Sequence, residues 1–327
     1  VVAYVYFVLT STGLTFVASL AMVFGFKDFY PIAKRCIWLA VATLLAGFAS
    51  LAFEIGHPFR MLWALPLSFQ ILSPLNWMGP FYALYLVLLL LKFGKINAGD
   101  WDSGASRKLG IASFIAVVLA HGTLGMVFGA MAMRPMWFGP MIPLYFLLTA
   151  ALSGAAFAIL ITYVAYGSQQ AMPAKVRELM TGAMPKAFGV VLAVALLAAI
   201  FRTVTGLWSN ADGLEVWDHV IASPWYWIEM IGMVVALFIL LSAELRNQAA
   251  MQLAAALLVI LALFIGRYEF IISGQLVPLF KGSWVPGLID YTPSLTEWML
   301  ALLAFSATFV IYGIGEKMFN LSAEPAE

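Results

Sequence analysis

The chain has 327 residues, of which 64% are hydrophobic and only 10% are charged. Its 17 basic and 16 acidic residues almost balance, so its charge gives no sign of nucleic-acid binding. A mean hydropathy of +0.98 excludes an ordinary water-soluble domain and predicts an integral membrane protein.

Apolar runs recur along the whole chain. Each holds about 20 residues, the length that an α-helix needs to cross a hydrocarbon layer of about 30 Å. The runs are too uniformly apolar for the alternation of a membrane β-barrel, so we expect an all-α fold. The predicted spans, about nine in number, are residues 1–25, 36–56, 77–93, 109–131, 140–166, 186–208, 224–243, 248–271 and 296–314.

The order of these spans predicts two four-helix bundles with a last helix packed outside them. The first bundle would occupy residues 1–135 and the second bundle residues 136–272. Residues 273–327 would then form an outer loop, the last transmembrane helix and a short cytoplasmic tail.

The basic residues predict the orientation. If Val1 lies outside, 12 of the 17 lysines and arginines fall inside. These inner residues are Lys27, Lys34, Arg35, Lys92, Lys95, Arg107, Lys108, Lys175, Arg177, Lys186, Arg246 and Lys317. The remaining outer ones are Arg60, Arg134, Arg202, Arg267 and Lys281. The positive-inside rule therefore places Val1 outside and the carboxy terminus in the cytoplasm. The first helix opens without a polar flank, so the sequence leaves open whether another segment precedes Val1 in the protein.

Few residues are suited to a metal or a haem. Cys36 is the single cysteine, which excludes an internal disulfide and a cysteine-ligated iron–sulfur cluster. Of His57, His121 and His219, only His121 is well inside a predicted helix, whereas a haem with two histidine ligands needs two that face each other. We therefore expect neither haem nor metal in this chain.

Six ionisable side chains lie within predicted helices, where each costs about 2.5–3.5 kcal/mol and needs a partner or a function. They are Glu54, His121, Arg202, Glu229, Arg267 and Glu269. The last four balance in charge, so they predict either ion pairs between helices or a route for protons.

Glu54 and His121 are the residue types that a quinone site needs. A quinone accepts hydrogen bonds at two carbonyl oxygens, and its quinol releases protons together with electrons, so an imidazole and a carboxylate in an apolar setting suit both forms. Two simpler interpretations stay open. His121 is then a core histidine bonded to a helix carbonyl or to Thr123, and Glu54 pairs with His57 or Arg60.

Two outer segments, residues 61–75 and 273–294, are apolar but broken by prolines, and the second carries several aromatic residues. Such segments either lie flat at the membrane interface or form a platform for another protein.

Several loose motifs together resemble one family. They are "FEIGHPFRMLW" at 53–63, "SPLNWMGPFY" at 73–82, "AHGTLGMVFGAMAMRPMWFGPMIPLYFLLTAALSGAA" at 120–156, "RYEFIISGQLVPLFKGSW" at 267–284 and "YTPSLTEW" at 291–298. Over most of its length the chain is similar to the NrfD/PsrC family of quinone-interacting membrane anchor subunits. It departs from the family pattern at His57, where many members have Arg, and at "AHGTLG", where "HQSSLG" is more common.

The resemblance implies a subunit of the bacterial inner membrane that oxidises or reduces menaquinone or ubiquinone near the periplasmic face, as part of a multi-subunit respiratory oxidoreductase. It implies electron exchange with an iron–sulfur subunit on that side, and with a further catalytic or multihaem cytochrome subunit. His121 and Glu54 would contact the quinone headgroup and relay protons. The residues expected to line the quinone pocket are His57, Arg60, Asn76, Trp77 and Gly125.

Two rival functions remain at this point. An ion-coupled secondary transporter is also all-helical, but the chain has no pair of matching helices broken by Gly or Pro, and its charges lie toward one side of the membrane. The other rival is a membrane anchor without a reactive site.

Overall fold

A computed structural model describes residues 1–209, 216–278 and 287–325, and within these residues it contains helices and no strand. Lys281 lies in the part of the outer loop, residues 279–286, that is outside the described residues. The α-helices are α1 (Val2–Met22), α2 (Tyr30–Glu54), α3 (Pro58–Leu67), α4 (Pro74–Asn97), α5 (Gly104–Gly129), α6 (Ile142–Tyr166), α7 (Ala174–Thr181), α8 (Ala183–Trp208), α9 (Val216–Ala222), α10 (Pro224–Leu241), α11 (Ala249–Gln275) and α12 (Leu295–Met318). Two short 3₁₀ turns, η1 (Lys27–Phe29) and η2 (Gln169–Ala171), lie in the connections.

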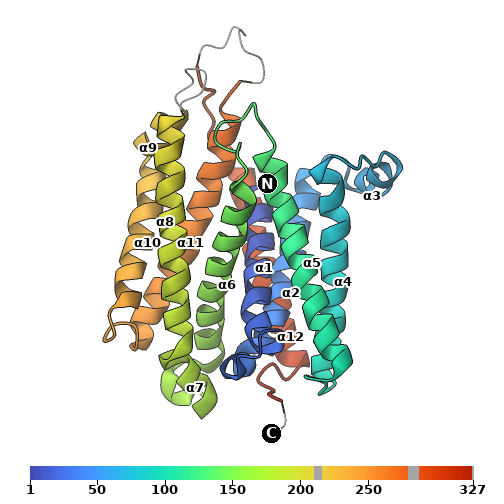
Figure 1. The fold of residues 1–327 in the computed structure, drawn as a ribbon, viewed down its shortest axis with the longest axis vertical. Helices are drawn as coiled ribbons and strands as arrows, with labels where there is room; N and C mark the ends of the chain where they lie inside the picture. The colour runs from blue at the N-terminus through green and yellow to red at the C-terminus, as the bar shows by residue number, and fades with distance from the viewer. Residues whose placement is uncertain (210–215, 279–286, 326–327) are drawn as a thin grey trace.

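The molecule has two distinct ends (Figure 1). The amino terminus, α3 and α9 lie at one end, which we call the α3 end, and α7 and the carboxy terminus lie at the other, the α7 end. The long helices run alternately between them, so the loops that carry the predicted inner basic residues all fall at the α7 end. Which end faces the cytoplasm stays a prediction.

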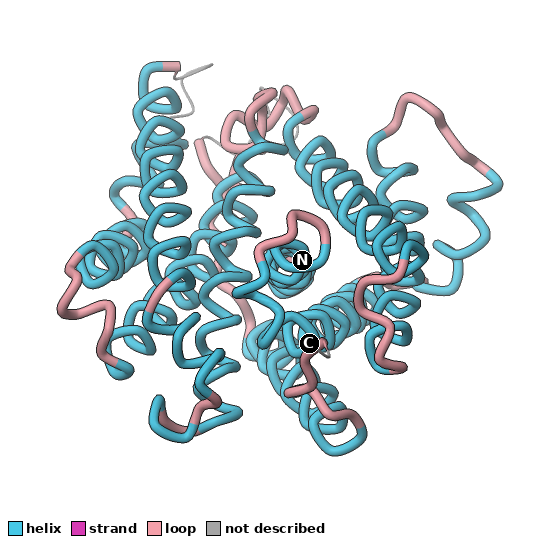
Figure 2. The backbone as a smooth tube through the Cα atoms, turned by 60° about the horizontal axis from the view of Figure 1, so that its bottom comes forward, coloured by secondary structure: helices cyan, strands magenta, loops and turns pink. Residues whose placement is uncertain are grey.

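Helix α1 lies at the centre (Figure 2). It packs against α2, α5, α6, α11 and α12, and nearly all of its side chains are buried by these neighbours. Helices α1, α2, α4 and α5 contact one another in sequence around a ring, as do α6, α8, α10 and α11, while α12 packs on α2. The domain boundaries at 135 and 272 stay a prediction, because α1 packs along α6 across the first of them.

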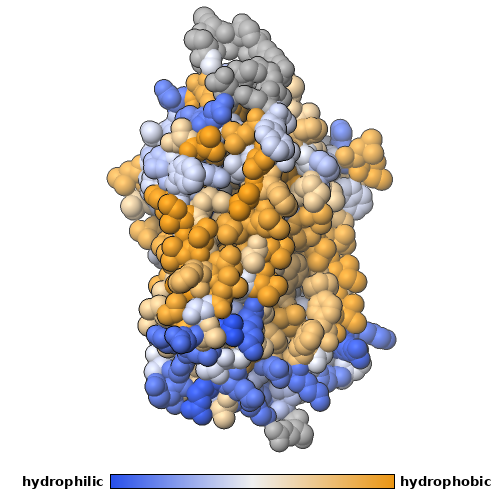
Figure 3. Space-filling model, turned by 60° about the vertical axis from the view of Figure 1, so that its left-hand side comes forward, coloured by the Kyte–Doolittle hydropathy of each residue, from blue (hydrophilic) through white to orange (hydrophobic). Residues whose placement is uncertain are grey.

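Nine helical segments of the described residues are long and apolar enough to span a membrane, which confirms the all-α membrane fold. On the face that Figure 3 shows, a broad belt of apolar side chains lies between more polar ends. Helices α4 and α12 contribute many of the side chains that the protein leaves uncovered, such as Leu84 and Phe309. These side chains face lipid when the belt is in a bilayer.

The ends of the helices follow local rules. The second span begins at Tyr30 rather than at residue 36, because Pro31 fits the first turn of a helix. The helix also accommodates Arg35, whose guanidinium is buried and pairs with Glu316 of α12 at 2.6 Å. Ser294 begins α12 with a capping box that includes Glu297.

Two glycines let α1 and α6 touch at their backbones. A Cβ on Gly13 would lie 1.8 Å from the carbonyl oxygen of Ala150, and a Cβ on Gly154 would lie 2.0 Å from the carbonyl carbon of Gly13. The hydroxyls of Thr10 and Ser153 are 2.8 Å apart beside this crossing. Small residues at such a crossing are a common way of joining helices in membranes.

Candidate functional site

His121 is fully buried and keeps one ring nitrogen without a partner. It lies eight residues before the end of α5, about 12 Å below the α3 end of that helix. Its Nδ1 is 3.0 Å from the hydroxyl of Tyr82 on α4, and its ring packs on Phe146 of α6 with centroids 5.8 Å apart. Its Nε2 has no hydrogen-bond partner among the described residues. A buried polar atom left unpaired is uncommon in a folded protein and points to a missing partner.

The residues around this pair are aromatic and apolar. The ring of Tyr82 meets the edge of Phe48 on α2 with centroids 5.8 Å apart, and Tyr4 of α1 donates its hydroxyl to the sulfur of Met78 at 3.8 Å. Helices α1, α2, α4 and α5 therefore converge on one level of the first ring of helices. We call Tyr4, Phe48, Met78, Tyr82 and His121 the His121 site.

Sequence reasoning missed Tyr82, and the simpler interpretation that it left open for His121 named a helix carbonyl or Thr123 as the partner. A signal was present in the sequence. Helices α4 and α5 are consecutive and antiparallel, and Tyr82 lies eight residues after Pro74 while His121 lies eight residues before Gly129. Equal distances from the same end of two neighbouring helices place the two side chains at the same depth.

Glu54 lies elsewhere, at the α3 end of α2. It lines a cavity of about 420 Å³ between the start of α1, the end of α2, α11 and α12. The wall of this cavity includes Tyr268 and Trp298, whose rings stack with centroids 6.0 Å apart. On its rim, the hydrogen bond from Tyr291 to the carboxylate of Glu297 raises the pKa of Tyr291 to about 12. The structure thus gives Glu54 and His121 separate surroundings, on different neighbours.

The remaining residues predicted for the pocket have identifiable local contacts. His57 precedes the first residue of α3 and Arg60 lies within it, and both are exposed. Asn76 is buried, with its amide nitrogen 3.5 Å from the carbonyl of Ser68. Trp77 donates to the carbonyl of Ile71 at 2.8 Å. Asn76 and Trp77 therefore hold the turn between α3 and α4 against the start of α4.

Gly125 is required for packing between helices. A Cβ at this position would lie 2.5 Å from the Cα of Pro143, near the start of α6. The glycine lets α5 and α6 approach each other one turn beyond His121.

Arg202 and Arg267 lie against aromatic rings. The guanidinium of Arg267 lies 4.4 Å from the ring centroid of Phe146 and donates to the hydroxyl of Thr149. The guanidinium of Arg202 lies 5.2, 5.1 and 4.9 Å from the ring centroids of Tyr145, Trp217 and Phe270, which come from three different helices. It also donates to the carbonyl of Met136 at 3.3 Å. Cation–π contacts of this kind stabilise a desolvated guanidinium.

The two carboxylates of this group have different neighbours. Glu269 accepts hydrogen bonds from Ser223 at 2.6 Å and from Ser273 at 3.2 Å. Glu229 lies directly against Gly266 of α11, where a Cβ would be 2.2 Å from its Oε1. Within the described residues no direct ion pair joins Glu229 or Glu269 to either arginine. A role of these four residues in proton transfer stays a prediction.

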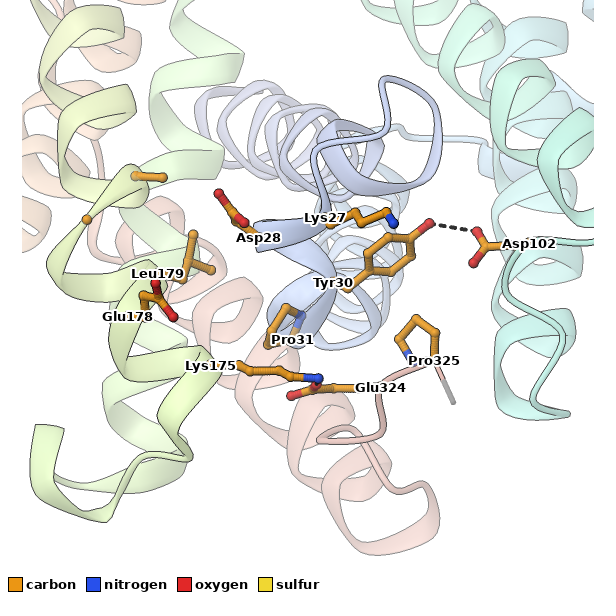
Figure 4. Close-up of a pocket in the computed structure, with 12 residues that line it drawn as sticks. Lys27, Asp28, Tyr30, Pro31, Asp102, Lys175, Glu178, Leu179, Glu324 and Pro325 are labelled. Atoms are coloured by element: carbon orange, nitrogen blue, oxygen red, sulfur yellow. Dashed lines mark hydrogen bonds and ion pairs between the residues drawn. The ribbon is translucent and has the colours of Figure 1, made fainter. Parts of the chain in front are cut away.

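A second cavity opens at the α7 end (Figure 4). It measures about 750 Å³, and its lining includes Lys27, Asp28, Asp102, Glu178 and Glu324. The hydroxyl of Tyr30 donates to Asp102 at 2.6 Å across it. None of the predicted site residues lies on this wall. So strongly charged a lining differs from the mostly apolar walls of sites for ring-shaped organic ligands.

Comparison with known proteins agrees with the resemblance of the motifs. The chain is similar to a subunit of the selenate reductase of Mesobacillus selenatarsenatis, with 24% identity over 96% of this chain and 83% of that protein. It is also similar to the Hdr-like menaquinol oxidoreductase integral membrane subunit of Archaeoglobus fulgidus, with 24% identity over 98% of this chain and 84% of that protein. The family model described as polysulphide reductase, NrfD, matches residues 1–279. The chain therefore belongs to the NrfD family of membrane proteins.

Proposed function

We propose that this protein is the quinone-reactive membrane subunit of a respiratory oxidoreductase complex, and that the quinone ring binds at the His121 site. The observation that carries the proposal is the unpaired Nε2 of His121 in a fully buried, aromatic setting. The family supports it, since one relative is named as a menaquinol oxidoreductase subunit. We propose menaquinone or ubiquinone as the substrate.

The contact between Tyr82 and His121 suits both redox states of a quinone. When the hydroxyl of Tyr82 donates to Nδ1, the ring proton is on Nε2, which donates to a quinone carbonyl oxygen. When Tyr82 accepts from Nδ1, Nε2 is free to accept a proton from a quinol hydroxyl. The two tautomers of His121 therefore serve the two redox states, and the hydroxyl of Tyr82 matches Nδ1 in both because it can donate or accept.

Oxidation of a quinol releases two protons and two electrons, and the residues of the chain are proposed to handle the protons only. His121 takes the first proton, and Glu54 exchanges protons at the α3 end, beside the cavity that it lines. His57 and Arg60 follow Glu54 along the chain and are exposed at the α3 end, and we propose that they shape the mouth of the pocket. Electrons pass to an iron–sulfur or haem subunit docked at the α3 end, which we propose is the periplasmic side.

Arg267 has a supporting role in this scheme. Its guanidinium covers Phe146, the ring that packs on His121, and its hydrogen bond to Thr149 fixes it on α6. This contact connects the His121 site to the second ring of helices.

The test replaces His121 by leucine in the complete complex. Electron transfer with the quinone should fall at least about a hundredfold, because general acid–base groups contribute about 10²–10⁴ to rates. The reaction of the partner subunit with a soluble dye should be unchanged.

A matched pair of tyrosines separates the site from general packing. Tyr82→Phe removes only the hydroxyl that holds His121, and should lower quinone turnover about tenfold, the effect of one hydrogen bond of about 1.4 kcal/mol. Tyr85→Phe makes the same change one turn along α4, where the hydroxyl meets Ser11 and Thr15, and should leave turnover near normal. Full quinone turnover in the His121→Leu complex would refute the His121 site and favour the rival function, a membrane anchor without a reactive site.

A further inference from the structure

Helix α3 lies between two membrane spans, at the level where both of them end. Helix α2 stops at Glu54 and α4 begins at Pro74, so the segment between them stays at the α3 end. The ten residues of α3 extend over about 15 Å, half of what a membrane crossing requires. In Figure 1, α3 projects sideways from the helices instead of covering their ends.

The exposed face of α3 is apolar. Phe59, Trp63 and Leu67 are 80%, 57% and 81% exposed, and a spacing of four residues places the three side chains on one face of the helix. The apolar surface continues into the turn that follows, where Leu72 is 93% exposed. Arg60 is the charged side chain of the helix.

A short helix at the opposite end has the reverse pattern. Helix α7 buries Val176, Leu179 and Met180 against the protein, and it exposes Arg177 and Glu178. This is the arrangement of a helix whose outer face meets water. The chain therefore gives α3 and α7, two short helices at opposite ends, opposite outer faces.

We propose that α3 lies flat in the boundary between lipid headgroups and acyl chains, with Phe59, Trp63 and Leu67 inserted among the acyl chains. The level of the helix and its continuity with the apolar belt of α4 favour lipid over a protein partner, since Leu75 at the start of α4 is also exposed. A tryptophan and an arginine on an apolar helix are typical of this boundary, where the indole lies at headgroup level and the guanidinium reaches lipid phosphates. The inference is independent of the quinone chemistry.

The test measures the surroundings of single side chains in the purified complex, reconstituted in vesicles of phosphatidylethanolamine and phosphatidylglycerol. Cys36 is the only cysteine of this chain, so Cys36→Ser gives a chain in which one introduced cysteine carries a nitroxide label, and the Cys36→Ser complex without an introduced cysteine, treated in the same way, is the blank for cysteines of the partner subunits. The labelled positions are Phe59 and Leu67 on α3, Leu84 on the belt of α4 as the lipid control, and Ala174 on α7 as the water control. Collision with oxygen reports lipid, and collision with a water-soluble nickel chelate reports solvent.

Labels at Phe59 and Leu67 should show the same pattern as the label at Leu84. They should collide often with oxygen and rarely with the nickel chelate. A pattern like that of Ala174 would overturn the proposal, because it would place α3 in water. Protection from both reagents would also overturn it, because a partner subunit or a second copy of the chain would then cover the helix. Each labelled site is exposed, so folding is checked simply by the size-exclusion profile of the complex.

Discussion

Replacing Gly13 by alanine should force α1 and α6 apart at the centre of the protein. The new Cβ would lie 1.8 Å from the carbonyl oxygen of Ala150, whereas ordinary contacts begin at 3.4 Å, so the helices must separate by about 1.5 Å. The obstructing atom is backbone and cannot rotate away. Overpacking of this kind costs about 1–3 kcal/mol, and the hydrogen bond between Thr10 and Ser153 beside the crossing contributes about 1 kcal/mol more. We expect a total loss of about 2–4 kcal/mol.

The assay is thermal unfolding of the purified protein in detergent, with Gly313→Ala as the control. Gly313 lies within α12, and a Cβ there meets nothing within 4 Å, so alanine should be neutral or slightly stabilising. Gly154→Ala at the same crossing should resemble Gly13→Ala, and the double variant should lose less than the sum of both, because the helices are already apart. Equal melting temperatures for Gly13→Ala and Gly313→Ala would refute the close contact.

Three further substitutions, with Lys95→Met as a control for one of them, test contacts at the ends of the helices. Arg35→Met should make α12 more sensitive to protease, because it removes the partner of Glu316, and an unchanged cleavage pattern would count against this contact. Lys92→Met should lower the melting temperature, at a cost of about 2–4 kcal/mol, because the buried ammonium donates to the carbonyl of Trp101 and to the carbonyl and hydroxyl of Ser106. Lys95 lies on the same helix as Lys92, and Lys95→Met removes only its exposed ion pair with Asp100, so this change should have almost no effect. Equal losses of melting temperature in the two variants would contradict the argument. Arg134→Gln should speed hydrogen exchange at the end of α11, where the guanidinium donates to the carbonyls of Gly274, Gln275 and Val277, and exchange equal to that of the unsubstituted protein would refute it.

The membrane spans were predictable because hydropathy is a property of consecutive residues. A helix that crosses lipid must be apolar along its length, so the sequence marks it without knowledge of its neighbours. The ends were less accurate where charged residues continue the helix, as at Lys34 and Arg35, which are both buried. Arg35 bonds to Glu316 of α12 and to Ser322 of the tail. Helix α3 was expected only as an apolar, proline-broken segment, because Pro58 and Pro66 conceal its helical pattern.

The candidate site was only partly predictable, because it depends on which helices become neighbours. His121 stood out from the sequence since an ionisable side chain in a membrane helix is costly. Its contact with Tyr82 needed the antiparallel pairing of α4 and α5. The stacking of Arg202 on three rings could not be predicted at all, because those rings come from α6, α9 and α11.

The central position of α1 has a consequence for biosynthesis. This helix emerges from the ribosome before α6 and α11. Until they are made, the part of its surface that they later cover remains in contact with lipid. Thr12 and Ser19 tolerate the delay, because their hydroxyls bond to carbonyls of their own helix at 2.9 and 2.7 Å. Tyr6 does not, since its hydroxyl donates to Ile260, 254 residues later in the chain. Nascent chains that stop before α11 should therefore retain an unsatisfied phenol in the bilayer and be recognised as incomplete by membrane proteases.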